Sequence, residues 1–132
     1  MHTTNTQNTL IVPAKDCKPV AKPPEKAGSV AALQYEILVA APYDLTSDEV
    51  LSSVAAARKG IADDAFPQFR ETFFSKGQPC FRASPLTKTN GWAVHANEAG
   101  RLAVIDPNSA DFETLIARDD VDVIPAMRNK RV

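Results

Sequence analysis

The sequence predicts an α+β protein in a single domain, residues 1–132, with an antiparallel sheet and helices packed on one face of it. Three observations predict this class. Helical spacing of apolar residues dominates residues 30–75, and alternating patterns typical of strands follow Gly77. The length of 132 residues suits one compact domain, and no internal repeat divides it.

A short strand and a proline-rich strap come first along the chain. Residues 8–12 (NTLIV) have the composition of a strand, and Pro13 ends that strand or confines it to a sheet edge. Residues 13–28 hold four prolines and four lysines, so they are unsuited to a regular ladder. We predict that this segment runs over the surface as an extended strap.

Two helices with favourable N-caps are predicted after the strap. Ser29 suits the N-cap of a helix at 30–41, which should be largely buried because it carries few polar residues. Those polar residues are Gln34 and Glu36. Thr46 and Glu49 have the spacing of a capping box for a second helix at 47–58.

A third helix is predicted at about 63–75, ending before Gly77. Aromatic residues recur along one face of it at positions i, i+3, i+7 and i+8. They are Phe66, Phe69, Phe73 and Phe74. We interpret this stripe as core packing, not as a cofactor site.

Strand patterns dominate the remainder of the chain. The alternating or apolar segments are residues 79–84, 92–96, 101–105 and 121–124. A glycine-containing turn ending at Gly100 joins the second and third of them as a hairpin. A further helix is predicted at 110–118, and residues 125–132 form a basic tail.

Composition and charge argue against a nucleic-acid-binding, membrane-spanning or secreted protein. The net charge of −1 gives no global reason to expect nucleic-acid or membrane binding, and no apolar run is long enough to span a bilayer. The N-terminal apolar run is too short for a secretory signal. The cysteines, Cys17 and Cys80, lack close spacing, which favours a reduced, cytoplasmic protein. We expect no cofactor.

Chemically versatile side chains concentrate in residues 73–95, FFSKGQPCFRASPLTKTNGWAVH. Alternation along the predicted strands would point Phe81, Trp92 and Val94 to the core. The same alternation would gather the polar positions on the opposite sheet face, provided that the strands share one sheet. These positions are Cys80, Arg82, Ser84 and His95.

The local charge favours a binding role. Residues 70–91 carry four basic residues against one acidic residue, a local net charge of +3. Arginine suits bidentate recognition of carboxylate or phosphate. We therefore expect a binding module for a small anionic ligand or a protein partner, and the sequence leaves a homo-oligomer open. The expected ligand-binding residues are Lys76, Arg82, Ser84, Lys88, Trp92 and His95.

The plainest interpretation of the polar face is that it is only the solvated side of a half-covered sheet. Three further alternatives stay open at this point. The first is an enzyme in which His95 activates a nucleophilic Cys80. The second is a metal site, which we do not expect because its ligands lack short paired spacings. Its candidate ligands would be His2, Cys17, Cys80 and His95. The third is a structural or interaction protein with no small-molecule site.

Three stretches of sequence form a longer pattern: MHTTNTQNTLIVPAKDC (1–17), FFSKGQPCFRASPLTKTNGW (73–92) and PAMRNKR (125–131). This pattern resembles a family of small uncharacterised proteins, a domain of unknown function in bacteria and some fungi. The resemblance implies no activity, but it implies that the N-terminal segment with His2 belongs to the domain. Thr6-Gln7 stand where the family's pattern has an aromatic residue, and Ala93 stands where it has glycine.

Overall fold

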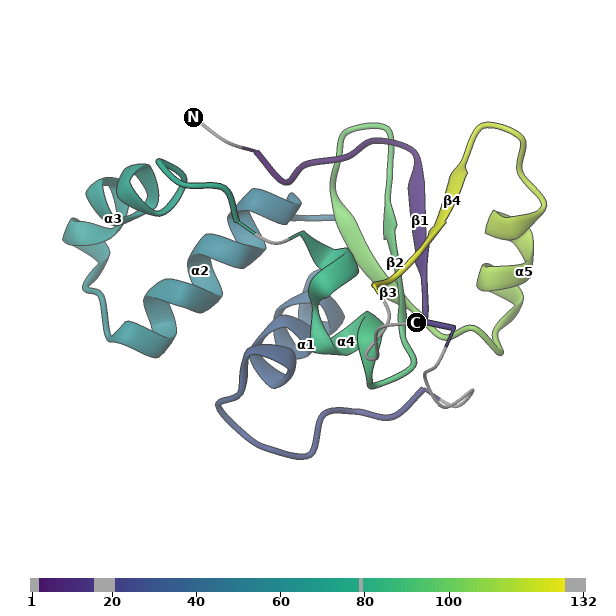
Figure 1. Cartoon of the computed structure of the whole chain (residues 1–132), viewed down its shortest axis with the longest axis horizontal. Coiled ribbons are helices and arrows are strands. Elements are labelled where there is room, and N and C mark those ends of the chain that lie inside the picture. Colours follow the sequence, from purple (N-terminus) through teal and green to yellow (C-terminus); the bar gives the residue numbers. More distant parts are fainter. Residues whose placement is uncertain (1–2, 16–20, 79, 128–132) are drawn as a thin grey trace.

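The computed structural model describes residues 3–15, 21–78 and 80–127 (Figure 1). The helices are α1 (Val30–Ala40), α2 (Ser47–Lys59), α3 (Phe66–Phe73), α4 (Pro85–Lys88) and α5 (Ala110–Ile116). The strands are β1 (Thr9–Val12), β2 (Ala93–Ala96), β3 (Leu102–Ile105) and β4 (Asp122–Pro125). The α+β class is therefore confirmed, but the sheet is mixed, not purely antiparallel, and α5 lies on the face opposite the other helices, so the predicted packing on one face is wrong. No helix in the described ranges is long and apolar enough to cross a membrane.

The four strands form one mixed sheet in the order β3-β2-β1-β4. β2 pairs antiparallel with both β1 and β3, whereas β4 pairs parallel with β1. β3 and β4 therefore run in the same direction, and the chain between them has to cross the sheet. α5 forms this crossover, which is why it lies on the opposite face from α1, α2 and α4 (Figure 1).

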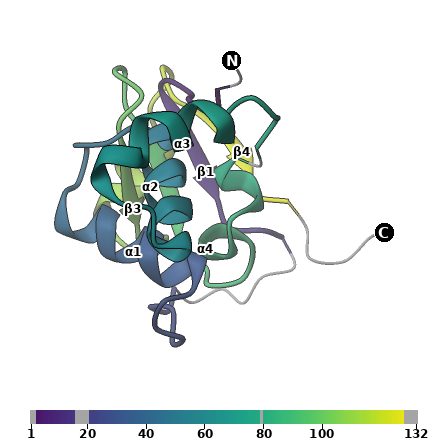
Figure 2. The same cartoon turned by 90° about the vertical axis from the view of Figure 1, so that its left-hand side faces the viewer.

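Each face of the sheet has its own apolar core. On the side of α1, α2 and α4, the strands contribute Ile11, Val94, Ala96, Leu102 and Ile124. On the side of α5, they contribute Leu10, Ala93, Ala103 and Ile105, which pack with Leu115. Figure 2 shows the helices of the first side in front of the sheet. Burial on both sides explains why strand residues of either parity are apolar.

Local signals in the sequence determine the boundaries of α1 and α2. Ser29 accepts a hydrogen bond from the backbone N–H of Ala32 and caps α1. Thr46 and Glu49 form the predicted capping box at the start of α2. Gly60 ends α2 with φ +68°, a backbone conformation that suits glycine.

The predicted strand at 79–84 is wrong. The described residues Phe81–Ala83 form a 3-10 turn, and Ser84 caps α4 by accepting a hydrogen bond from the N–H of Leu86 at 3.2 Å. A serine followed by proline is a strong helix-start signal, and here it outweighs the weak alternation. Pro85 occupies the first helical position, where its missing N–H leaves no hydrogen bond unmade.

The aromatic stripe of α3 is only half-buried. Phe74 is fully buried just after the helix, but α3 itself contains no buried residue. The interpretation of the whole stripe as core packing is therefore wrong for Phe66, Phe69 and Phe73. α3 projects from the body of the protein beside α2 (Figure 1).

The described parts of the strap lie along α4 and the start of β2. Ala14 N–H donates to the carbonyl of Thr87 at 2.9 Å, and Lys22 N–H donates to the carbonyl of Asn90 at 2.9 Å. Trp92 Nε1 returns a hydrogen bond of 2.8 Å to the carbonyl of Lys22. The strap therefore covers α4 of its own chain.

The N-terminal segment is fastened to the first turn of α2 by a buried carboxylate. Asp48 accepts hydrogen bonds from the Thr4 backbone N–H at 2.6 Å, from the Thr4 hydroxyl at 2.7 Å and from the Thr3 hydroxyl at 2.7 Å. The Asp48 N–H donates in turn to Asn5 Oδ1 at 2.8 Å. This position at a helix N-terminus also favours the negative charge.

We predict that Asp48→Ala lowers the free energy of unfolding by about 2–3 kcal/mol, because buried donors of Thr4 lose their acceptor. Urea denaturation followed by circular dichroism measures the loss. Asp44→Ala is the matched control, since Asp44 is exposed, and it should change stability by less than about 0.5 kcal/mol. Equal stability of the two variants would contradict this account of the N-terminal segment.

Candidate functional site

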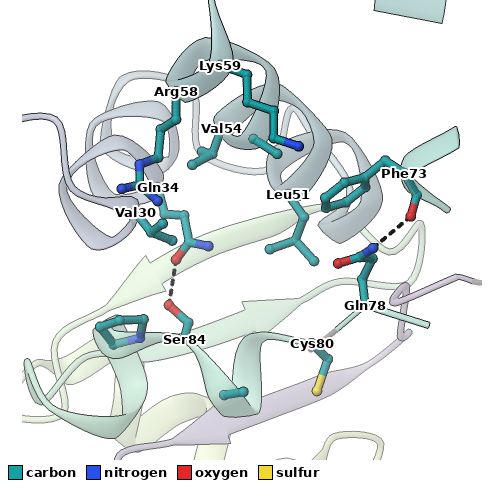
Figure 3. A pocket seen from close by; sticks show the side chains of 13 residues that line it. Val30, Gln34, Leu51, Val54, Arg58, Lys59, Phe73, Gln78, Cys80 and Ser84 are labelled. Atoms are coloured by element: carbon teal, nitrogen blue, oxygen red, sulfur yellow. Dashed lines mark hydrogen bonds between the residues drawn. The ribbon is translucent and has the colours of Figure 1, made fainter. Parts of the chain in front are cut away.

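A pocket of about 430 Å³ lies between α1, α2, residue 78 and residues 80–85 (Figure 3). Its walls are mainly apolar and come from both helices, the end of α3 and the start of α4. The apolar lining includes Val30, Leu51, Val54, Phe73 and Pro85. The polar lining is Gln34, Arg58, Lys59, Gln78, Cys80 and Ser84. A volume of this size is typical of small-molecule sites.

Two basic residues stand at the solvent end of the pocket. Arg58 and Lys59 are the last residues of α2, and both are exposed. Within the described ranges, Arg58 forms no ion pair, and Lys59 Nζ lies 5.6 Å from the centroid of the Phe69 ring. No aspartate or glutamate is among the described residues that line the pocket. The entrance is therefore electropositive.

A buried amide lies deeper in the pocket. Gln34 on α1 is only 2% exposed, and its Oε1 accepts a hydrogen bond of 2.5 Å from the Ser84 hydroxyl. Its Nε2 makes no hydrogen bond within the described part of the chain. In Figure 3 this nitrogen points away from Ser84 toward the space between α1 and α2. Among the described residues, His95 Nε2 is the buried polar side-chain atom without a partner, so Gln34 Nε2 stays accessible from the pocket and is free to donate to a ligand there.

Gln78 lines the same pocket but has a protein partner. Its Nε2 donates to the carbonyl of Phe73 at 2.7 Å, which ties the segment after α3 to the end of that helix. The two amides of the pocket therefore differ in one respect: the donor of Gln78 is already used, and that of Gln34 is not.

Cys80 lies between two cavities. It is a half-buried free thiol that lines the large pocket and also a smaller cavity of about 110 Å³ against the sheet. The smaller cavity is bounded by strand residues such as Ile11 and Ile124. In Figure 3 its sulfur points away from Gln34 and Ser84.

The residues expected to bind a ligand do not form one group. Ser84 lines the large pocket and Arg82 lines the small cavity, where its Nε donates to the carbonyl of Pro125 at 2.8 Å. Trp92 packs on Tyr35 with ring centroids 5.2 Å apart. The other three expected ligand-binding residues line neither of these two cavities. They are Lys76, Lys88 and His95.

His95 lies on the other face of the sheet. It is 4% exposed, its Nδ1 is 2.8 Å from the Tyr43 hydroxyl, and its Nε2 has no hydrogen-bond partner among the described residues. Because Cys80 lies with the core on the α1 and α2 side, the sheet separates it from His95. The backbone of Tyr43 has φ +59°, an uncommon conformation for a bulky residue.

The candidate metal ligands do not gather in the described ranges, where no cluster of three potential ligand residues occurs. His2 and Cys17 lie outside the described residues. Cys80 and His95 are separated by the sheet, as shown above.

Sequence reasoning missed the two cations and the amide of the pocket. Basic residues in the last turn of a helix are common because they interact favourably with the negative end of the helix dipole. Arg58 and Lys59 therefore gave no separate indication of a ligand site. Gln34 did give one, because it is a polar residue on a helix that is otherwise apolar and buried.

The buried His95 makes stability depend on pH. Burial lowers the pKa of His95, Arg118 adds to this effect, and Asp120 opposes it. The unfolded chain therefore binds a proton near pH 6.5 that the folded chain does not, and stability falls as the pH drops below that value.

We predict that His95→Gln loses less stability than the wild type between pH 7 and pH 5. Identical pH slopes in urea denaturation would refute this.

Comparison with known proteins agrees with the resemblance seen in the sequence. A family model described as a family of unknown function, DUF6157, matches residues 1–132. No curated protein and no solved structure matches the chain. Because the family model covers the whole chain, the protein belongs to the DUF6157 family of unknown function.

Proposed function

We propose that the protein is a binding module for a small amphipathic anion, held in the pocket between α1 and α2. The observation that carries this proposal is the combination of a mainly apolar pocket with two exposed cations, Arg58 and Lys59, at its solvent end. The apolar body of the ligand enters the pocket, and its carboxylate, sulfonate or phosphate group stays at the entrance.

The apolar walls supply most of the affinity. Val30, Leu51 and Val54 offer aliphatic surface, and Phe73 and Pro85 offer flat surface. Removing apolar surface from water contributes about 25 cal/mol per Å², so a ligand of ten or more carbon atoms gains several kcal/mol. The entropy lost on binding offsets part of this gain. We expect micromolar affinity as the order of magnitude.

The cations orient the ligand more than they tighten its binding. Arg58 and Lys59 are exposed, so water and salt screen their attraction for an anion. Each contributes on the order of 0.2–1 kcal/mol, and more where the guanidinium binds a carboxylate with two hydrogen bonds. A single orientation follows, with the anionic group outward.

Binding is favoured over nucleophilic catalysis by the surroundings of Cys80. A useful cysteine nucleophile needs a base or positive group directed at its sulfur. No histidine or carboxylate that could act as a base is among the described residues that line the pocket. Arg58 and Lys59 line the same pocket, but in Figure 3 the Cys80 sulfur points away from both of them. A protein partner fits less well, because the recess suits a compact molecule.

We predict that the double variant Arg58→Gln, Lys59→Gln weakens binding of 1-anilinonaphthalene-8-sulfonate about fivefold to tenfold at low salt, because the sulfonate loses two cationic neighbours. Binding of N-phenyl-1-naphthylamine, the same ring system without the sulfonate, should stay unchanged. Fluorescence titration measures both affinities.

Two control variants make this test specific. Lys26→Gln with Arg101→Gln removes the same charge from exposed positions that do not line the pocket, and it should leave both affinities unchanged. Ala55→Phe places a ring into the pocket wall and should abolish binding of both dyes. If both dyes bind Ala55→Phe as they bind the wild type, the proposed site is wrong.

A further inference from the structure

Gln34 interrupts an apolar and buried helix face. Its neighbours on that face, Ala31 and Leu38, belong to the core, and Gln34 itself is only 2% exposed. A buried amide is unfavourable unless its donors and acceptor are hydrogen-bonded. The Oε1 atom of this amide accepts a hydrogen bond from Ser84, and its Nε2 atom faces the pocket.

Ser84 fixes which half faces the pocket. Its hydroxyl accepts a hydrogen bond from the Leu86 N–H at 3.2 Å while capping α4, and it donates its proton to Gln34 Oε1. In this arrangement the hydroxyl gives its proton to Oε1 and uses one lone pair on the Leu86 N–H, so Oε1 lies toward Ser84. The Nε2 group is thereby turned toward the pocket, as Figure 3 shows.

The polar groups of the pocket therefore differ in exposure. Arg58 and Lys59 are exposed at the entrance, whereas Gln34 is buried. A ligand with its anionic group at the entrance brings its apolar body past Nε2. A plain hydrocarbon body displaces water from this donor and leaves it without an acceptor, whereas a carbonyl oxygen in the body satisfies it.

We propose that Gln34 determines ligand specificity, and that the ligand is an amphipathic acid with a carbonyl oxygen within its apolar body. This inference rests on the function proposed above and narrows its ligand class from apolar anions in general to oxo acids and similar acyl compounds. Gln34 Nε2 donates to the carbonyl oxygen, and Ser84 acts as a positioning residue for that amide.

The test compares acids that differ only in one carbonyl group. The probes are 6-phenylhexanoate and its 4-oxo, 5-oxo and 6-oxo derivatives, each competing with 1-anilinonaphthalene-8-sulfonate. A site with a buried donor discriminates against an analogue that leaves it unpaired. At least one oxo acid should bind about tenfold more tightly than 6-phenylhexanoate to the wild type.

Matched variants assign this preference to one amide. Gln34→Met has a similar length without the N–H donors and should reduce the tenfold ratio to about one. Gln78→Met changes an amide of the same pocket whose donor already serves Phe73, so the ratio should persist. Because Gln34→Met changes a core position, circular dichroism and a thermal melt confirm that it is folded.

A measurement on the unaltered protein gives a second readout. The side-chain NH₂ signals of Gln34 in a ¹H–¹⁵N spectrum should shift with the preferred oxo acid and shift less with 6-phenylhexanoate. Equal affinities for all four acids, or a preference that survives in Gln34→Met, would overturn the inference while the proposed function stands. If none of the acids displaces the dye, the proposed function and this inference fail together.

Discussion

The hydroxyl group of Ser84 joins the two structural units that make the pocket. By accepting from Leu86 it starts α4, and by donating to Gln34 it binds the start of α4 to the middle of α1. The segment that leads up to Ser84, residues 80–83, is thereby held against α1 and α2. This contact acts together with the hydrogen bonds from Gln78 to Phe73 and from Arg82 to Pro125, which hold the same segment on either side.

The mixed sheet explains why the two faces of the protein differ in chemistry. The crossover through α5 covers one face and encloses His95 with Tyr43, leaving that pair apart from the pocket. The other face supports α1, α2 and α4, and the pocket lies between these helices and the segment after α3. The separation follows from strand alternation, because neighbouring residues of β2 point to opposite faces.

Much of the fold follows from local signals in the sequence. The caps at Ser29 and Thr46, the end of α2 at Gly60 and the strands around the hairpin all lie where capping and alternation predict them. The segment at 79–84 was misassigned because six residues of weak alternation compete with the Ser84-Pro85 start signal. The direction of β4 depends on a long-range pairing with β1, which periodicity alone does not encode.

The candidate site was much less predictable than the fold. Closeness in sequence suggested a site from Lys76 to His95, but the turns and the sheet distribute these residues over both faces. Ser84 is the predicted ligand-binding residue that lines the pocket, yet its partner Gln34 is 50 positions away in the chain. Arg58 and Lys59 join it only because α2 packs beside α1, a tertiary contact without a short motif.

The location of ligand binding is the central claim, and backbone chemical-shift mapping tests it most directly. ¹H–¹⁵N spectra would be recorded during titration with 6-phenylhexanoate and its oxo derivatives. The account predicts that shifts concentrate at the segments that line the pocket, above all around residues 30–34, 51–59 and 80–85. Shifts that concentrate instead on α5 and β4, or spectra that do not change at millimolar acid, would contradict it.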